Sequence, residues 1–302
     1  MTMKRFIPTV IMMFLAACST QQQQKEEIGG IVTPPEEQQA EPGVTKPTVE
    51  KPTPIKPFKP AMPGARVSSV SVPGKYVAIT FDDGPNSSLT PQVLDILKRH
   101  GAHATFFVLG DNASRNPGIL ARAVAEGHEI GNHTYSHIKM TASSDEKIAS
   151  EISRTNSIIT SATGRSPKVM RPPYGATNTA IVNKMFSGYG MRSILWSIDT
   201  EDWRHPGVGV VVRRAVGSAK PGSIILLHDI HSSTIAAVED IVTGLQARGY
   251  TLVTVSQLIE MGKQAAQAET AQPGLQPENV SVVPVSVSGG AGAATISGGS
   301  SL

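Results

Sequence analysis

The sequence predicts an α/β fold with a mainly parallel sheet, because strand-like and helix-like patterns alternate between about residues 64 and 263. Short apolar runs rich in β-forming residues, such as Tyr76 to Phe81, are typical of strands buried on both faces. About seven such strands within roughly 190 residues suit a compact β/α barrel, complete or incomplete. A doubly wound open sheet fits the same alternation, so both architectures stay open at this point.

The individual elements follow from the same patterns. Asn116 as N-cap, Pro117 at the first position and Gly127 past the end mark one helix clearly. The predicted strands cover residues 76–81, 104–109, 128–132, 168–171, 192–198, 223–227 and 251–254. The predicted helices cover residues 90–100, 117–126, 144–163, 178–187, 208–218 and 234–248, and a last helix begins at Gln257.

The N-terminus predicts export. Lys4 and Arg5 precede an apolar segment, residues 6–17, that is too short to span a bilayer. Leu15-Ala16-Ala17-Cys18 resembles a bacterial lipoprotein signal, with residues 1–17 as the signal peptide and Cys18 as the lipidated first residue of the mature chain. Such a protein is anchored to a membrane and faces the cell wall or periplasm. Ser19 favours the outer membrane if the source is Gram-negative.

Two alternatives to lipidation are an ordinary cleaved signal with an incidental cysteine and an uncleaved anchor. Because Cys18 is the only cysteine, the chain forms no internal disulfide. The net charge of +3 is too small to indicate nucleic acid as a partner.

Two further segments lack the periodicity of a folded core. Residues 18–63 are rich in Pro, Lys, Glu and Gln, which predicts a semi-rigid, disordered tether. Residues 264–302 are rich in Gly, Ala, Ser and Val and are expected to form a low-complexity, disordered tail. The predicted domain therefore covers residues 64–263.

Five polar clusters lie where predicted strands give way to loops. The carboxyl ends of strands share one face in β/α folds, so the clusters are expected to meet there. The clusters are Asp82-Asp83, His133 to His137, Arg171 to Gly175, Asp199 to Trp203, and His228-Asp229.

Three of the clusters suggest metal and proton chemistry. His133 and His137 would lie on one face of a helical turn, close enough to bind one metal ion. Asp83 or Asp82 could supply a carboxylate ligand, since two histidines and one carboxylate are a common divalent-metal set. A histidine at a strand end, as His228 is, suits proton transfer near neutral pH. Taken singly, each cluster could equally be a polar loop, and His231 remains either a loop residue or part of the site rim.

Together, the five clusters resemble the motifs of the NodB-homology polysaccharide deacetylases, carbohydrate esterase family 4. The resemblance covers about Lys75 to Met261, with every motif present. The motifs are Thr80-Phe81-Asp82-Asp83, His133-Thr134-x-x-His137, Arg171-x-Pro173-Tyr174, Asp199-x-x-Asp202-Trp203 and Leu226-x-His228. It implies a distorted β/α barrel and metal-dependent removal of N-acetyl groups from N-acetylglucosamine residues.

The resemblance also implies a role for each residue. The metal would be bound by Asp83, His133 and His137; it is usually zinc in this family, with cobalt, manganese, nickel or iron tolerated. Asp82 would be the general base, oriented by Arg171, and His228 the general acid, supported by Asp202. The backbone N–H of Tyr174 would face the oxyanion, and the acetyl pocket would be lined by Tyr174, Trp203 and Leu226.

The lipoprotein signal and tether favour cell-wall peptidoglycan as the polymer. Poly-N-acetylglucosamine and chitin oligomers are alternatives, and an O-acetyl (xylan) esterase would carry the same motifs. A non-catalytic wall-binding lipoprotein would be expected to lack a ligand or the base, and this sequence lacks neither.

Overall fold

The computed structural model describes residues 64–271. The predicted signal peptide, Cys18, the tether and residues 272–302 of the predicted tail lie outside the described residues. Within residues 64–271, no helix is both long enough and apolar enough to cross a membrane.

The strands form one sheet in which every strand pair is parallel, as expected from the alternating pattern. Their order across the sheet is β1-β6-β5-β4-β3-β2-β8-β7, and β9 pairs with β2. The strands are β1 (Arg66–Val67), β2 (Tyr76–Asp82), β3 (Ala104–Val108), β4 (Glu129–Asn132), β5 (Val169–Met170), β6 (Arg192–Ile194), β7 (Ile198–Asp199), β8 (Ile224–His228) and β9 (Thr251–Leu252).

This strand order distinguishes the barrel from a doubly wound sheet. From β2 to β6 each strand pairs with the next one along the chain, and β8 and β7 follow on the other side of β2. The chain therefore winds in one direction around an axis, without the reversal of direction that defines a doubly wound sheet. Because β1 and β7 are the two ends of the order, the structure is an incomplete, distorted β/α barrel.

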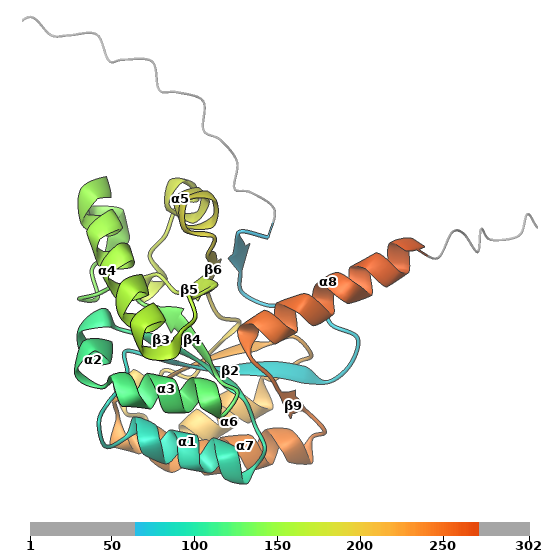
Figure 1. The fold of residues 1–302 in the computed structure, drawn as a ribbon. Coiled ribbons are helices and arrows are strands. Elements are labelled where there is room, and N and C mark those ends of the chain that lie inside the picture. The colour runs from blue at the N-terminus through green and yellow to red at the C-terminus, as the bar shows by residue number, and fades with distance from the viewer. Residues whose placement is uncertain (1–63, 272–302) are drawn as a thin grey trace, which may run out of the picture. The chain divides into compact units, whose positions relative to one another are not determined.

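Helices cover the outside of the curled sheet (Figure 1). Neighbouring helices α6, α7, α1, α3 and α4 contact one another in that order and form a continuous outer layer. The helices are α1 (Thr90–Arg99), α2 (Gly110–Arg115), α3 (Pro117–Ala125), α4 (Asp145–Thr163), α5 (Thr179–Tyr189), α6 (Val208–Gly217), α7 (Ser232–Ala247) and α8 (Val255–Ala271).

One hydrophobic cluster lies between the sheet and this helical layer and a second lies on the other face of the strands, and together they fix the position of β2. All residues of β2 after Tyr76 are buried, and Phe81 stacks on Phe106 of β3 with ring centroids 5.2 Å apart. Burying each large apolar side chain stabilises the fold by about 1.5–3 kcal/mol. Asp82, the last residue of β2, is therefore held at a rigid point of the molecule.

The predicted strand over residues 192–198 is wrong in one respect, because it is two strands. The N–H of Leu195 donates to Val67 O of β1, the strand that pairs with β6. The N–H of Ser197 instead donates to Ile224 O of β8. Residues 195–197 thus carry the chain from one end of the sheet order to the other. The apolar run is continuous because both halves are buried, so the break leaves no mark in the sequence.

Three other expectations need correction. The last helix continues to Ala271, past residue 263, because Ala, Gln and Glu at 264–271 favour helix. The Asn116 side chain does not cap α3; its Nδ2 donates to Asn112 O instead. The short elements β1 and α2 were not predicted, since two and six residues are too few for a periodic pattern.

Candidate active site

The five polar clusters converge at the carboxyl ends of the strands, as predicted. They surround a pocket of about 450 Å³. Its lining is Asp82, Asp83, His133, His137, Tyr174, Gly175, Trp196, Asp199, Trp203, Leu226 and His228.

Asp83, His133 and His137 form a cluster with the donor set of a divalent-metal site. Asp83 Oδ1 lies 3.4 Å from Nε2 of each histidine. It is buried and has no hydrogen-bond partner among the described residues. Burial raises the pKa of Asp83, but the two histidines and His228 outweigh it and lower the pKa to about 2. An ionised carboxylate oxygen with two imidazole nitrogens beside it fits a divalent cation.

The two histidines do not lie on a helical turn, which corrects the sequence-based expectation. Thr134 and His137 adopt left-handed φ angles of 66° and 58°, so the segment is an irregular loop. The rings nevertheless come within 5.1 Å of each other, centroid to centroid. His133 Nδ1 lies 2.7 Å from Arg171 O. Since a carbonyl only accepts, Nδ1 carries the proton and Nε2 keeps a free lone pair.

Asp82 has one carboxylate oxygen held and one available. Arg171 Nη1 donates to Asp82 Oδ1 at 2.8 Å, while Oδ2 faces His133 Nε2 at 3.8 Å. Arg171 is fully buried, and it also donates to Thr80 Oγ1 and to the carbonyls of residues 194 and 195. Its guanidinium lies 4.2 Å from the ring centroid of Phe107. These contacts fix the guanidinium in place, and it in turn holds Asp82 by Oδ1.

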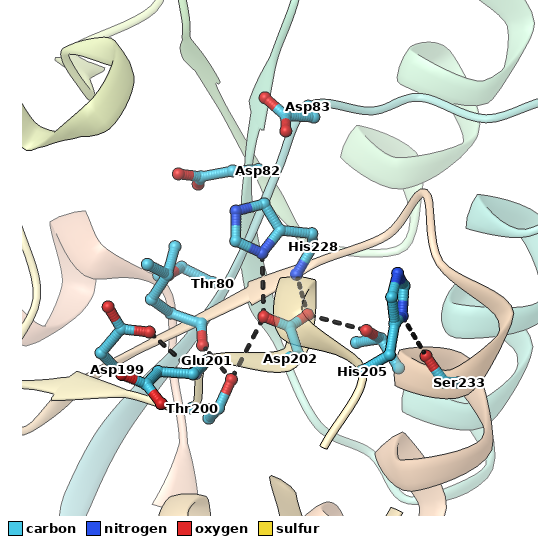
Figure 2. A network of polar contacts seen from close by, with 12 residues as sticks. Thr80, Asp82, Asp83, Asp199, Thr200, Glu201, Asp202, His205, His228 and Ser233 are labelled. Atoms are coloured by element: carbon cyan, nitrogen blue, oxygen red, sulfur yellow. Dashed lines mark hydrogen bonds and ion pairs between the residues drawn. The ribbon is translucent and has the colours of Figure 1, made fainter. Parts of the chain in front are cut away.

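His228 and Asp202 form a second ionised pair, and His228 lines the same pocket (Figure 2). Asp202 accepts from His228 Nδ1 at 2.9 Å and from the His228 backbone N–H at 2.8 Å. Thr200 and Thr234 donate their hydroxyls to the same carboxylate. Burial lowers the pKa of His228, but Asp202, with Asp82 and Asp83, outweighs it and raises the pKa to about 9. The imidazole is therefore protonated at neutral pH.

Apolar and aromatic side chains complete the pocket. Leu226 is buried at its base, whereas Tyr174 and Trp203 are the two large apolar side chains, within residues 64–271, that stay exposed, at 67% and 46%. Tyr174 contacts the His137 ring edge-on at a centroid distance of 4.5 Å. Its backbone adopts a left-handed φ of 61° where it lines the pocket. The three residues expected to line the acetyl pocket thus lie together.

Three pocket residues received no role from the sequence. Trp196 lies in the segment that crosses between the two ends of the sheet, and Gly175 packs on it so closely that a Cβ there would approach the indole to 3.0 Å. Asp199 lines the pocket and accepts from the N–H of Glu201. The feature of the sequence that could have pointed to Trp196 is its indole ring near the end of the predicted strand 192–198.

Other residues outside the pocket support it. Asp229 follows His228 and packs its buried carboxyl against Gly84, and Glu151 of α4 binds the loop between the two histidines. His231 lies outside the pocket lining, with its ring 4.8 Å from His205 and 6.1 Å from His228. It is the N-cap residue of α7.

Comparison with known proteins agrees with this fold. The family model described as polysaccharide deacetylase matches residues 69–193. A peptidoglycan-N-acetylglucosamine deacetylase of Bacillus cereus is 43% identical over 190 residues, covering 61% of this chain and 88% of that protein. The structure of the peptidoglycan deacetylase PdaC from Bacillus subtilis matches with a TM-score of 0.61 and 41% identity, over 65% of this chain and 95% of that one.

The chain belongs to the polysaccharide deacetylase family. A further relative, the peptidoglycan-N-acetylglucosamine deacetylase PgdA of Listeria monocytogenes, is 42% identical over 208 residues. That match covers 65% of this chain but only 44% of the Listeria protein. The similarity therefore concerns the barrel domain and not the whole of the longer relative.

Proposed function

We propose that this protein is a metal-dependent deacetylase that removes N-acetyl groups from N-acetylglucosamine residues of cell-wall peptidoglycan and releases acetate. The observation that carries the proposal is the arrangement of one pocket. The pocket brings an Asp-His-His cluster together with a carboxylate that has a free oxygen, Asp82, and with a protonated histidine, His228. These are the groups that amide hydrolysis by water requires.

Asp83, His133 and His137 hold the metal in this proposal, and zinc suits their mixed oxygen and nitrogen donors. When bound, the metal polarises the amide carbonyl and lowers the pKa of its water toward about 7. The unpartnered Oδ1 of Asp83 and the free Nε2 of His133 support this assignment. Cobalt, manganese, nickel or iron would be alternatives with the same donors.

Asp82 acts as the general base and His228 as the general acid. Asp82 Oδ2 takes a proton from the attacking water as the new C–O bond forms at the acetyl carbon. His228 then gives its proton to the amide nitrogen as the C–N bond breaks, so that the sugar leaves as an amine and the acetyl group as acetate. Arg171 orients Asp82, and Asp202 keeps His228 charged.

The tetrahedral oxyanion requires a donor that is already in place. We assign this role to the backbone N–H of Tyr174, whose rigid, left-handed position follows Pro172 and Pro173. One such donor contributes about 3 kcal/mol in comparable sites. Tyr174, Trp203 and Leu226 form the apolar pocket for the acetyl methyl group.

The choice of polymer and location rests on the relatives and on the N-terminus. The Bacillus cereus and Listeria proteins are named peptidoglycan-N-acetylglucosamine deacetylases. Lipidation of Cys18 would anchor this protein to a membrane outside the cytoplasm, in reach of the wall, and in a Gram-negative source Ser19 favours the outer membrane. The exposed rings of Tyr174 and Trp203 suit contact with the faces of sugar rings.

The test measures acetate release by the full chain from four polymers in parallel: peptidoglycan, chitin oligomers, poly-N-acetylglucosamine and acetylated xylan. We expect the fastest release from peptidoglycan and its loss after treatment with a metal chelator, restored by zinc. Faster release of acetate from another N-acetylated polymer would make that polymer the substrate in place of peptidoglycan. Release from acetylated xylan alone would make the protein an O-acetyl esterase, and no release from any polymer would reject the deacetylase.

A further inference from the structure

The loop between the two histidines of the metal cluster has a backbone that its own residues do not favour. Thr134 and His137 both adopt left-handed φ angles, 66° and 58°. Residues with a branched or bulky side chain seldom do so, because the Cβ crowds the carbonyl oxygen. Contacts from outside the loop must therefore hold it in this shape.

A carboxylate from α4 provides those contacts. Glu151 Oε2 accepts hydrogen bonds from the backbone N–H groups of Tyr135, at 2.8 Å, and Ser136, at 2.7 Å. Glu151 Oε1 accepts the Ser136 hydroxyl at 2.8 Å and lies 2.9 Å from Lys147 Nζ. Two of the three residues that separate the histidines are thus bound to one side chain. A concave turn of N–H groups is a natural site for an anion.

Glu151 lies on a mainly apolar face of α4, in which Thr155 is the other buried polar residue. Ile148, Ile152 and Ile159 cover the same buried face of the helix, and Glu151 itself is only 4% exposed. Burial raises the pKa of Glu151, but Lys147, Ser136 and Tyr135 outweigh it and lower the pKa below its ordinary value. A charge in such a place is costly unless specific partners compensate for it. The hydrogen-bond partners of the Glu151 carboxylate lie mainly in the loop between His133 and His137.

The two histidines differ in how their rings are held. His133 is fixed from behind by its bond to Arg171 O. The ring of His137 has no such bond in the described part of the chain; it meets only Asp83, the His133 ring and the edge of Tyr174. The position of His137 therefore depends on its backbone, which follows directly after the two residues bound by Glu151.

We propose that Glu151 is a positioning residue that holds His137, and with it the spacing of the two histidines, ready to bind the metal. The inference rests on the metal site of the proposed function. Partners in this outer layer commonly change metal affinity 10–100-fold when they are removed. Glu151 differs from the ligands in that it acts through the backbone of the loop and touches no metal.

The experiment measures the dissociation constant of the full chain for zinc by competition with a chromophoric chelator. The variants are Glu151→Ala, which removes every contact to the loop, and Glu151→Gln, which keeps the shape and one carbonyl acceptor. We expect the constant to rise about 10–100-fold for Glu151→Ala and less for Glu151→Gln. Deacetylase activity of both variants should return at higher zinc, and their cobalt-bound forms should show a changed visible absorption spectrum.

Glu146→Gln is the matched control, because it removes a carboxylate from the same helix without touching the loop, and it should bind zinc as the wild type does. Circular dichroism of the metal-free proteins sets a temperature at which each variant is folded. If Glu151→Ala does not fold at any temperature, Glu151→Gln decides the question. Wild-type zinc affinity in the folded Glu151 variants would overturn the role of Glu151 alone. A wild-type protein that binds none of zinc, cobalt, manganese, nickel or iron would overturn the metal site and the proposed function with it.

Discussion

Asp202 holds His228 at two points, accepting from the ring at Nδ1 and from the backbone N–H, so the orientation and the charge of the imidazole have one origin (Figure 2). The ring nitrogen Nε2 is left to face the pocket that contains Asp82 and Asp83. The geometry explains why the pKa of His228 is raised to about 9 despite its burial, which by itself lowers the pKa.

Replacing Asp202 by asparagine should narrow the pH range of activity. In the wild type, the rate should fall as the pH rises through about 9, because His228 then loses the proton it must donate. In Asp202→Asn the alkaline limb should move down toward about 6.5, the ordinary value for histidine. At pH 8 a histidine with a pKa of about 6.5 is only about 3% protonated, so kcat should fall about 30-fold. A pH–rate profile of kcat measures both effects.

The same substitution should change how stability depends on pH. A histidine whose pKa is higher in the folded state contributes stability that is complete below about pH 6.5 and is lost as the pH rises through about 9. Urea unfolding at several pH values should show this loss in the wild type and not in Asp202→Asn. Glu201→Gln removes a neighbouring carboxylate that pairs with Arg214, and it should leave the alkaline limb in place; an equal shift there would mean that general charge, and not Asp202, sets the pKa.

Asp82→Asn should separate catalysis from metal binding. Asp82 is held by Arg171 and lies beside the cluster formed by Asp83, His133 and His137 without being part of it. We expect the variant to keep stoichiometric zinc while its kcat falls by about 10²–10⁴-fold, the usual contribution of a general base. Elemental analysis and acetate release on the same preparation measure the two quantities. Asp83→Asn is the contrasting variant and should lose zinc and activity together, whereas full activity of Asp82→Asn would reject its role as base.

The sequence located most of this site because strand ends are easily found. Asp82 and His228 each close a short apolar run, and parallel strands bring their carboxyl ends to one face. Glu151 was missed because, four residues after Lys147, it looks like half of a surface ion pair on a helix. Its bonds to Tyr135 and Ser136 depend on how α4 packs beside the loop, and no local pattern encodes that packing.

The fold was likewise predictable where local sequence patterns decide it and not where strand pairing does. The direction of winding around the barrel became visible only through strand pairing, since alternating strands and helices suit two architectures equally. Trp196 lies in the pocket because the backbone of residues 195–197 changes its hydrogen-bond partner from β1 to β8. That change follows from the open side of the barrel and not from the local sequence, in which the apolar run continues unbroken.

Arg171 and Asp82 should show strong energetic coupling. Arg171→Met leaves the carboxylate of Asp82 buried without its partner, which typically costs about 3–5 kcal/mol of unfolding free energy. In an Asp82→Asn background the same change should cost less, because no unpaired charge remains. A double-mutant cycle by urea unfolding measures the difference, expected at about 0.5–3 kcal/mol for residues in contact. Additive effects would mean that the carbonyl and Thr80 contacts of Arg171, and not its pairing with Asp82, determine its contribution.

Gly84→Ala should disturb the metal cluster through a single added methyl group. Gly84 follows Asp83 directly, and a Cβ at Gly84 would lie closer than 3.0 Å to the carboxyl group of Asp229. Asp229 is buried and bound by Thr90, so it has little room to move. We expect the variant to lose about 1–3 kcal/mol of stability from overpacking and to bind zinc more weakly, because Asp83 must shift with its neighbour.

Asp229→Ala removes the obstacle, so Gly84→Ala should cost less in that background. Gly118→Ala, in α3 with no atom near its Cβ, is the matched control and should leave both quantities within error or raise the stability slightly. Urea unfolding and zinc competition on the four variants measure the outcome, and an unchanged zinc affinity in Gly84→Ala would show that the position of Asp83 does not depend on the packing of Asp229 against this glycine.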